Sequence, residues 1–265
     1  MKKLILSLLT MASLAFAANA ATTCMIVKTD DGKVVNYDVE SVVEVYYQET
    51  SSDQGVTVSG KMGKYTYVDL GLPSGTKWAT YNVGATKPTE YGDYFAWGET
   101  EPKKEYKFAH KWCEYLGTDS WHNTIYRYTK YWTNGELGTV DNKTVLDVED
   151  DAATANWGKE WRMPTSDEIK ELLEGCFWKQ VNDFHGSGVN GFWGISKANR
   201  ATIFLPAAGY FNVTVNDAVG SVGYYWSSSL DESYSGDAYT IEFYDIISRG
   251  DAPRYTGRSV RAVLR

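Results

Sequence analysis

The sequence predicts an α+β fold, with two helices and antiparallel sheets in the main domain and a small β-hairpin module before it. Three observations predict this class. Strand-like segments around turn residues precede the main domain, two short segments further on have helix signals, and apolar and polar residues alternate in the last third of the chain. Strands, then helices, then strands again are typical of α+β proteins.

Residues 1–20 have the features of a secretory signal peptide. Lys2 and Lys3 precede an apolar run over residues 4–17, and Ala18-Asn19-Ala20 has the small-residue pattern of a cleavage site. The apolar run is short for a membrane-spanning helix. We therefore expect an exported protein, located in the periplasm, at the cell surface or secreted, with no insertion into a membrane.

Residues 21–48 are predicted to form a small β module. Strand signals over residues 24–29 and 33–39 flank the turn residues Asp30-Asp31-Gly32, which indicates a hairpin. A third apolar run follows at residues 42–47.

The main domain is expected over residues 60–265, after a polar linker at residues 49–59. Its first elements are strand signals over residues 64–70 and 76–84, on either side of a turn rich in glycine and proline. Residues 85–144 are dense in Tyr, Trp, Lys and Glu but have poor periodicity. We expect long ordered loops with short elements in that region.

Two helices are predicted after this region. Asp150 and Asp151 precede residues 152–157, and acids at a helix N-terminus are stabilised by the helix dipole. The second helix begins at Thr165 and Glu168, whose T-x-x-E spacing is that of a capping box. Its apolar face consists of Ile169, Leu172 and Leu173.

The segment before the second helix combines rings and charges in a way that would also suit a site. Trp161 and Met163 are expected to close the core, and Pro164 lies directly before the cap. Arg162 has no obvious partner in the sequence: a bond to carbonyls or an acid would give it a structural role, and an open pocket a functional one. The residues assigned a structural role are Trp161, Arg162, Pro164, Thr165 and Glu168.

Alternation with a period of two predicts an antiparallel sheet in the last third of the chain. In residues 237–246, Tyr239, Ile241 and Phe243 share one face. Residues 257–264 are expected to form a strand with Val260, Ala262 and Leu264 inside and with Ser259 and Arg261 outside.

Several motifs occur in the order of a known family. They are "YVDLGLPSGTKWATYNVGA", "YGDYFAWGE", "NWGKEWRMPTSDEIKELL", "IFLPAAGY", "YYWSSS" and "GRSVRAV". Together they resemble the Fibrobacter major paralogous domain, a family of exported proteins frequent in Bacteroidota, over residues 65–265. The resemblance implies a C-type-lectin-like fold, in the branch that includes formylglycine-generating enzymes. It implies a fold and export but no ligand, because a fold does not determine a function.

The sequence lacks the residues for two activities known in this fold, calcium-dependent sugar binding and formylglycine generation. Calcium-dependent lectins use E-P-N or Q-P-D with W-N-D, whereas residues 101–103 read E-P-K and no W-N-D occurs. Formylglycine-generating enzymes use a pair of late cysteines, and no cysteine follows Cys176. We therefore expect a protein that is not an enzyme, with no catalytic residues, no metal ligands and no cofactor.

The composition narrows the range of partners. A net charge of −8 disfavours nucleic acids and anionic membranes. The 10 Trp and 20 Tyr residues suit a β-rich core and also a sugar-binding surface. The cysteines Cys24, Cys113 and Cys176 do not form a disulfide framework, and a pairing of Cys113 with Cys176 stays open.

Two short motifs each have a functional and a simpler explanation. The acids in residues 147–151 offer oxygen ligands for calcium, but EF-hand spacing is absent and helix N-terminal charge accounts for Asp150 and Asp151. Arg249-Gly250-Asp251 matches an adhesion tripeptide, whereas a solvated turn between strands is the simpler explanation.

Aromatic residues near strand ends are the candidate ligand-binding residues. In a C-type-lectin-like domain the long loops usually carry binding, and exposed rings there would stack on sugar faces or anchor a protein. Trp226 also suits a core position, whereas Tyr234 lies in a polar loop. The candidates are Tyr234, Trp226, Tyr210 and Trp193.

The leading hypothesis is an exported, non-enzymatic binding domain that recognises a glycan or a protein through loop aromatics. A surface-appendage or assembly subunit is one alternative, and an exposed strand edge in the N-terminal module would favour it. A hydrolase with carboxylates that the sequence does not mark is the other. A cluster of acids in a deep cleft, with a raised pKa on one of them, would favour the hydrolase.

Overall fold

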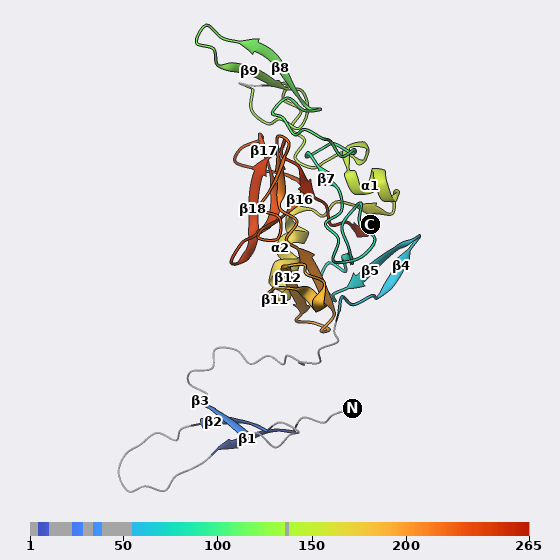
Figure 1. The fold of residues 1–265 in the computed structure, drawn as a ribbon, viewed down its shortest axis with the longest axis vertical. Helices are drawn as coiled ribbons and strands as arrows, with labels where there is room; N and C mark the ends of the chain where they lie inside the picture. Colours follow the sequence, from blue (N-terminus) through green and yellow to red (C-terminus); the bar gives the residue numbers. More distant parts are fainter. Residues whose placement is uncertain (1–4, 11–22, 29–33, 39–54, 136–137, 265) are drawn as a thin grey trace, which may run out of the picture. The chain divides into compact units, whose positions relative to one another are not determined.

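The computed structural model describes residues 5–10, 23–28, 34–38, 55–135 and 138–264 (Figure 1). Several predicted features lie outside these residues: the cleavage site, the turn at residues 30–32, the apolar run at residues 42–47 and most of the linker. The chain divides into two compact units, Met1–Ser51 and Ser52–Arg265.

The N-terminal unit contains one antiparallel sheet in the order β1-β2-β3. Its strands are β1 (Ile5–Thr10), β2 (Thr23–Lys28) and β3 (Val34–Asp38). β2 and β3 pair antiparallel, as their strand signals predict. β1 comes from the apolar run of the predicted signal peptide and pairs along the whole length of β2.

A five-stranded sheet in the order β10-β20-β6-β5-β4 opens the second unit. The predicted hairpin is present as β5 and β6, which pair antiparallel with Val68 opposite Trp78. The last strand of the chain, β20, completes this sheet between β6 and β10. The strands are β4 (Gly60–Met62), β5 (Tyr65–Asp69), β6 (Lys77–Ala79), β10 (Trp161–Arg162) and β20 (Val263–Leu264).

A second five-stranded sheet has the order β18-β17-β16-β19-β7. Its pairs are antiparallel except for β16 and β19, which are parallel. The strands are β7 (Tyr94–Phe95), β16 (Gly223–Leu230), β17 (Asp237–Phe243), β18 (Ile247–Pro253) and β19 (Arg258–Ser259).

Three smaller sheets complete the second unit. A three-stranded sheet consists of β11 (Cys176–Val181), β12 (Gly191–Ser196) and β13 (Thr202–Pro206). Two hairpins are formed by β8 (Cys113–Thr118) with β9 (Thr124–Tyr128), and by β14 (Tyr210–Asn212) with β15 (Val215–Asp217). The β8–β9 hairpin extends away from the two large sheets (Figure 1).

Both predicted helices are present, and their starts follow from local sequence. In α1 (Ala152–Trp157), the Asp151 side chain accepts a hydrogen bond from the backbone N–H of Thr154. In α2 (Ser166–Gly175), Thr165 and Glu168 form the predicted capping box. Two short 3-10 turns, η2 (Val148–Asp150) and η3 (Phe184–Gly186), lie elsewhere in the unit.

The predicted fold class, an α+β C-type-lectin-like domain, is wrong. Strands make up 39% of the structure and helices 11%, so the chain is mostly β, with several small sheets. The helix signals are real, but the two α-helices span only 6 and 10 residues. The poorly periodic region between residues 85 and 144 carries β7, β8 and β9, which shifts the balance further towards strands.

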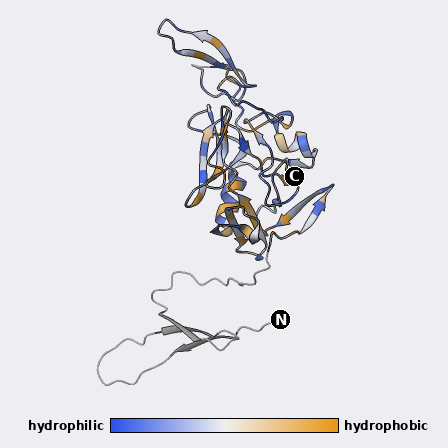
Figure 2. Ribbon diagram, viewed as in Figure 1, coloured by the Kyte–Doolittle hydropathy of each residue, from blue (hydrophilic) through white to orange (hydrophobic). Residues whose placement is uncertain are grey.

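Two main apolar clusters hold the second unit together. The first joins Ile169 and Leu172 of α2 to buried residues of β12, β13 and β17. The second contains Trp161 and Met163, which are both 1% exposed. Apolar residues gather on α2 and the strands beside it (Figure 2). Burial of this apolar surface is the main favourable term in the fold.

The prediction that Ser259 and Arg261 face outward is wrong. Both are 0% exposed, and residues 258–264 form two short strands that belong to different sheets rather than one alternating strand. The Arg261 guanidinium is buried because its N–H groups have acceptors. It donates to the side-chain oxygen of Asn82 at 2.9 Å, to the carbonyl of Ala79 at 3.2 Å and to the carbonyl of Phe204 at 2.9 Å.

Candidate functional site

One face of the β8–β9 hairpin is aromatic. In its antiparallel register, Cys113 lies opposite Tyr128 and Tyr115 lies opposite Tyr126. Directly opposite residues point to the same face of a pair of strands, so these four side chains form one row. Cys113 and Tyr128 are buried at the base of the hairpin, whereas Tyr115 is 57% exposed. The row therefore runs from the core out to solvent.

An open groove of about 350 Å³ lies beside this row. Its far side is formed by Asn212 and Val213, at the end of β14. Two backbone hydrogen bonds, of 2.8 and 3.2 Å, join Tyr106 to Val213 and hold that side in place. We call this feature the aromatic groove, and its rings are those of Tyr106, Phe108, Tyr115, Tyr126 and Tyr255.

The rings of the aromatic groove support one another. The centroid of Phe108 lies 4.0 Å from that of Tyr126 and 5.4 Å from that of Tyr255. Tyr115 and Tyr126 are 6.0 Å apart and tilted by 60°. The buried Tyr106 hydroxyl donates to the backbone carbonyl of Tyr94 at 2.6 Å. Such contacts limit the freedom of each ring, so the groove is prepared before a ligand arrives.

The groove offers stacking surfaces rather than acid–base chemistry. Among the described residues that line it, none carries a carboxylate, an imidazole or a thiol. Its one charged side chain, Lys107, has its ammonium 2.8 Å from the Glu105 carboxylate. Ring faces, phenol hydroxyls and the amide of Asn212 remain to contact a ligand.

The outer part of the β8–β9 hairpin exposes three large apolar side chains among polar residues. Trp121, in the turn between the strands, is 83% exposed, and Leu116 and Ile125 are 53% and 41% exposed. Exposed large apolar side chains that gather on one element are typical of an interaction surface.

The four aromatic residues predicted to bind ligand do not form one cluster, and none of them lines the aromatic groove. Two of them, Tyr210 and Trp226, lie against the same guanidinium, that of Arg258, at 5.4 and 5.2 Å. Tyr234 is 50% exposed, with its ring edge-on to Trp132 at 6.4 Å. Tyr210 is half-buried on β14 and packs against Tyr224 at 5.2 Å. Trp193 is half-buried on β12, opposite Phe204.

Trp226, the second residue predicted to bind ligand, lies in the core. Its side chain is 0% exposed and belongs to the second apolar cluster. Its indole N–H donates to the backbone carbonyl of Phe95 at 2.8 Å, which satisfies its polar atom inside the core.

Sequence reasoning missed the aromatic groove. The signal that points to it is the two-residue spacing of Cys113 with Tyr115 and of Tyr126 with Tyr128. A bulge between Tyr115 and Gly117 breaks the alternation along β8 and hides the strand pattern.

Arg162 has a partner, and that partner is Glu168. Its guanidinium donates to the two carboxylate oxygens of Glu168 at 2.6 and 2.5 Å and to the carbonyl of Met163 at 3.1 Å. Burial raises the pKa of Glu168, but Arg162 and the backbone N–H of Thr165 outweigh burial and lower the pKa to about 2. The carbonyl of Pro164 accepts from the backbone N–H of Ser228 at 2.7 Å. These contacts give the segment a structural role.

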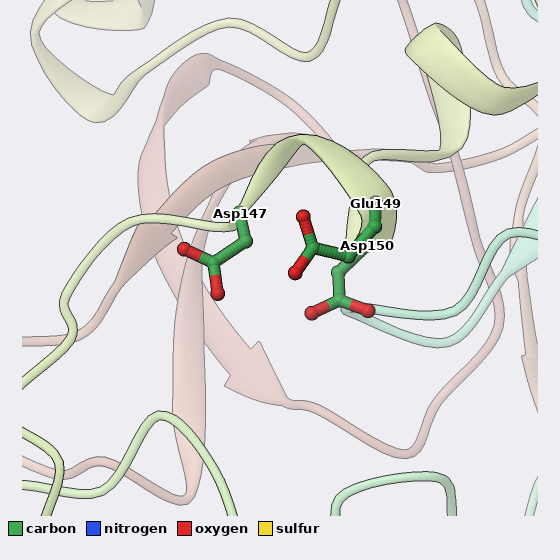
Figure 3. A group of neighbouring side chains, drawn as sticks. All are labelled: Asp147, Glu149 and Asp150. Atoms are coloured by element: carbon green, nitrogen blue, oxygen red, sulfur yellow. The ribbon is translucent and has the colours of Figure 1, made fainter.

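The acidic residues of the calcium candidate converge around lysine side chains. The carboxylates of Asp147, Glu149 and Asp150 come within 4.8 Å of one another (Figure 3). The ammonium of Lys130 lies 2.6 Å from both Asp147 and Asp150, and that of Lys111 lies 2.7 Å from Asp150. Burial raises the pKa of Asp150, but the two lysines and a tyrosine hydroxyl outweigh burial and lower it. A protein cation thus already occupies the place that a metal would take.

A second group of acids lies outside the aromatic groove. Burial, and after it the charges of Asp251 and Asp231, raises the pKa of the Asp237 carboxyl to about 6. Asp231 accepts hydrogen bonds from the backbone N–H groups of Ser233 and Tyr234. None of these acids lines the aromatic groove.

The adhesion tripeptide is not in a turn, so that expectation is wrong. Residues 249–251 lie inside strand β18, paired with β17. The Arg249 guanidinium donates to the hydroxyl of Ser166 at 3.0 Å and stacks 4.5 Å from the ring of Tyr239. These contacts hold the arginine against its own sheet.

Cys113 and Cys176 are free thiols, so they do not pair. Both are buried, and burial raises their pKa to about 11 and about 12. Thiols that stay protonated at neutral pH are poor nucleophiles, which assigns both cysteines to packing.

Comparisons with known proteins identify one partial similarity. Searches against curated proteins and against solved structures give no significant match. Among the helices of the described residues, none is long and apolar enough to cross a membrane. Residues 189–263, from the start of β12 to β20, are similar to a domain of unknown function, DUF8237.

Proposed function

We propose that this chain is an exported, non-enzymatic binding protein that recognises an extended glycan through the aromatic groove. The observation that carries the proposal is the series of braced rings from Phe108 to Tyr126 and Tyr115, open to solvent on one side. Ring faces stack on the C–H faces of sugars, while phenol hydroxyls and an amide meet the sugar hydroxyls.

A glycan is favoured over a protein partner by the chemistry of the groove. Its one exposed ring is that of Tyr115, and four of its five rings are tyrosines, which present an apolar face and a polar tip together. A protein partner is the alternative, and the exposed Trp121, Leu116 and Ile125 on the same hairpin support it. The acidic charge of the chain disfavours a nucleic acid.

Export rests on the sequence of residues 1–20, with its two lysines, apolar run and A-x-A pattern. Membership of the Fibrobacter major paralogous domain family, suggested by the motifs quoted above, is likewise a proposal and agrees with export. Location in the periplasm, at the cell surface or outside the cell would each suit a glycan-binding role.

Retardation in native gels that contain soluble polysaccharides, such as xylan, mannan or a β-glucan, tests the proposal. Tyr115→Ala and Tyr126→Ala each remove one ring from the row and should weaken binding by about tenfold or more. The analogy is with aromatic side chains that stack on nucleic-acid bases, where one ring contributes ~1–3 kcal/mol. Tyr234→Ala removes a tyrosine exposed outside the groove and is the matched control.

Two results would contradict groove binding. One is equal retardation of the wild type and both groove variants. The other is a loss confined to Tyr234→Ala, which would return the site to the loop predicted from sequence. If no polysaccharide retards the wild type and a protein partner binds through Trp121 instead, the alternative partner class replaces the glycan.

A role as an assembly subunit is the second candidate, and one observation favours it. β1 pairs with β2 along its full length, from Ile5 opposite Lys28 to Thr10 opposite Thr23. Removal of residues 1–20 would take β1 away and leave that edge of β2 open to a strand from a partner. Amide hydrogen exchange on the processed chain tests this. Fast exchange is expected at the β2 amides that face the place of β1, because the other β2 amides still pair with β3. Slow exchange of those amides without a partner would oppose strand addition.

A further inference from the structure

A second cavity, of about 230 Å³, shares no lining residue with the aromatic groove. It lies where β11 and β12 and the end of β17 meet the loop at Gly220. Its volume is slightly below the range of sites that enclose drug-sized ligands, so it suits one small ring rather than a chain. We call it the amide cavity.

The floor of the amide cavity is apolar. Phe192 and Phe243 belong to the core, with 4% and 3% of their surface exposed, and both line the cavity. Their centroids are 4.8 Å apart, at an angle of 44°. Because so little of either ring is exposed, the two rings close the base of the cavity, and the ring left for the C–H face of a sugar is that of Tyr244, which is 63% exposed.

The wall of the cavity is fixed by an amide. Asn190 donates from its side-chain nitrogen to the carbonyl of Gly220 at 2.9 Å, and its side-chain oxygen accepts from the backbone N–H of Asp183 at 3.1 Å. Gln180 donates in the same way to the carbonyl of Tyr244 at 3.3 Å. These bonds join three loops around the opening, so the cavity is formed in advance of a ligand.

The rim carries polar groups that are still available. Within the described residues, no hydrogen bond or ion pair engages the side chains of Asn182, Ser221 or Asp245, and all three are exposed. They provide an amide, a hydroxyl and a carboxylate, which together both donate and accept. Beside them, the Tyr244 side chain is 63% exposed and extends the apolar surface outward.

The charge of the lining selects among ligands. Among the described residues of the cavity there is one carboxylate, Asp245, and no lysine, arginine or histidine. A carboxylate or phosphate on the ligand would meet that negative charge without a compensating cation. A neutral ligand with several hydroxyl groups meets no such cost.

We propose that the amide cavity binds a single neutral sugar residue, in a site separate from the aromatic groove. The exposed ring of Tyr244 contacts the C–H face of the sugar, above the base closed by Phe192 and Phe243. The side chains of Asn182, Ser221 and Asp245 bond to its hydroxyls.

The test titrates glucose, galactose or mannose into the full chain. Binding is followed by two-dimensional NMR of the backbone amides. Glucuronic acid is the charged counterpart of glucose. At least one neutral sugar should shift the amide signals of residues 182, 221 and 244 in a saturable way, with a Kd of about 1–10 mM, typical in scale for a small ligand with few contacts. Glucuronic acid should bind at least tenfold more weakly than glucose if glucose is the ligand, because of Asp245.

The double variant Asn182→Ala, Asp245→Ala changes two exposed side chains that hold no other part of the structure, and it should weaken the neutral sugar at least tenfold. Tyr115→Ala, in the aromatic groove, should leave this titration unchanged, so failure of either site is distinguishable from failure of the other. The proposal is overturned if all three neutral sugars leave those signals unshifted, if the double variant binds like the wild type, or if Tyr115→Ala abolishes the shifts.

Discussion

At the residue scale, the structure separates side chains whose role is local from those whose role depends on distant partners. Thr165 and Glu168 were predictable, because a capping box is formed by residues three apart. The burial of Arg261 was not, because its acceptors are the carbonyls of Ala79 and Phe204, which lie far away in sequence. Trp226 shows the same limit, since its partner Phe95 is remote in the chain.

Glu168 is expected to stabilise the fold through its charge. Its pKa is about 2 in the folded protein against an ordinary value of 4.5, so its contribution is fully present above about pH 4.5 and is lost as pH falls towards 2. Glu168→Gln should reduce the free energy of unfolding at pH 7 by about 3 kcal/mol and flatten the acid limb of the stability curve. Glu174→Gln, on the exposed side of the same helix, is the control for urea unfolding followed across pH. A loss of equal size in both variants would oppose this role.

Asp237 is expected to act in the opposite direction. Its folded pKa of about 6 exceeds the ordinary value of 3.8, so the folded state holds the proton more tightly and stability decreases as pH rises from about 4 through 6. Asp237→Asn should therefore raise stability at pH 7, by up to ~3 kcal/mol, and have little effect at pH 3. Thermal unfolding at the two pH values measures this, and a variant less stable than the wild type at pH 7 would contradict it.

At the element scale, the β8–β9 hairpin is the element on which the proposed binding depends, and the sequence did not predict it. Its alternation is broken at the bulge after Tyr115, and its pairing joins residues on both sides of a turn. A two-stranded hairpin is marginal on its own, so it depends on packing at its base. Trp132 provides that packing by stacking on Tyr128, with centroids 4.1 Å apart and planes 5° apart.

Trp132→Ala is expected to loosen the hairpin more than the rest of the unit. Trp132 is 1% exposed, and truncation of a buried tryptophan typically costs about 3–5 kcal/mol. Hydrogen exchange should become faster in β8 and β9 while β16 and β17 stay protected. Trp121→Ala, at a site that is 83% exposed, should leave both regions unchanged. Equal loss of protection in β16 and β17 would show that the hairpin is not a separate cooperative element.

The acidic η2 turn is expected to need no metal. Lys130 and Lys111 already neutralise Asp147 and Asp150, so calcium gains nothing by binding there. The melting temperature should be the same in EDTA and in millimolar calcium. A rise in melting temperature with calcium, which follows when a ligand binds the folded state, would contradict this account.

At the scale of the whole molecule, the sequence located both helices and a minority of the strands, and it did not show that strands outweigh helices. The motifs between Tyr67 and Val263 marked individual elements correctly, for example β5 with β6 and the start of α2. The class was wrong because helix signals are strong and local, whereas short strands such as β7 and β19 are defined only by the partners that they meet. The aromatic groove could not be predicted for a similar reason, because β14 and the β8–β9 hairpin are separate in sequence and come together only in the folded chain.

A hydrogen-exchange footprint tests whether the aromatic groove holds the ligand. The full chain would be compared with and without the polysaccharide that retards it most strongly. We expect protection in residues 106–109, in β8 and β9 and around Tyr255, all of which line or form the groove. Protection centred on Tyr234, with none in the β8–β9 hairpin, would contradict it.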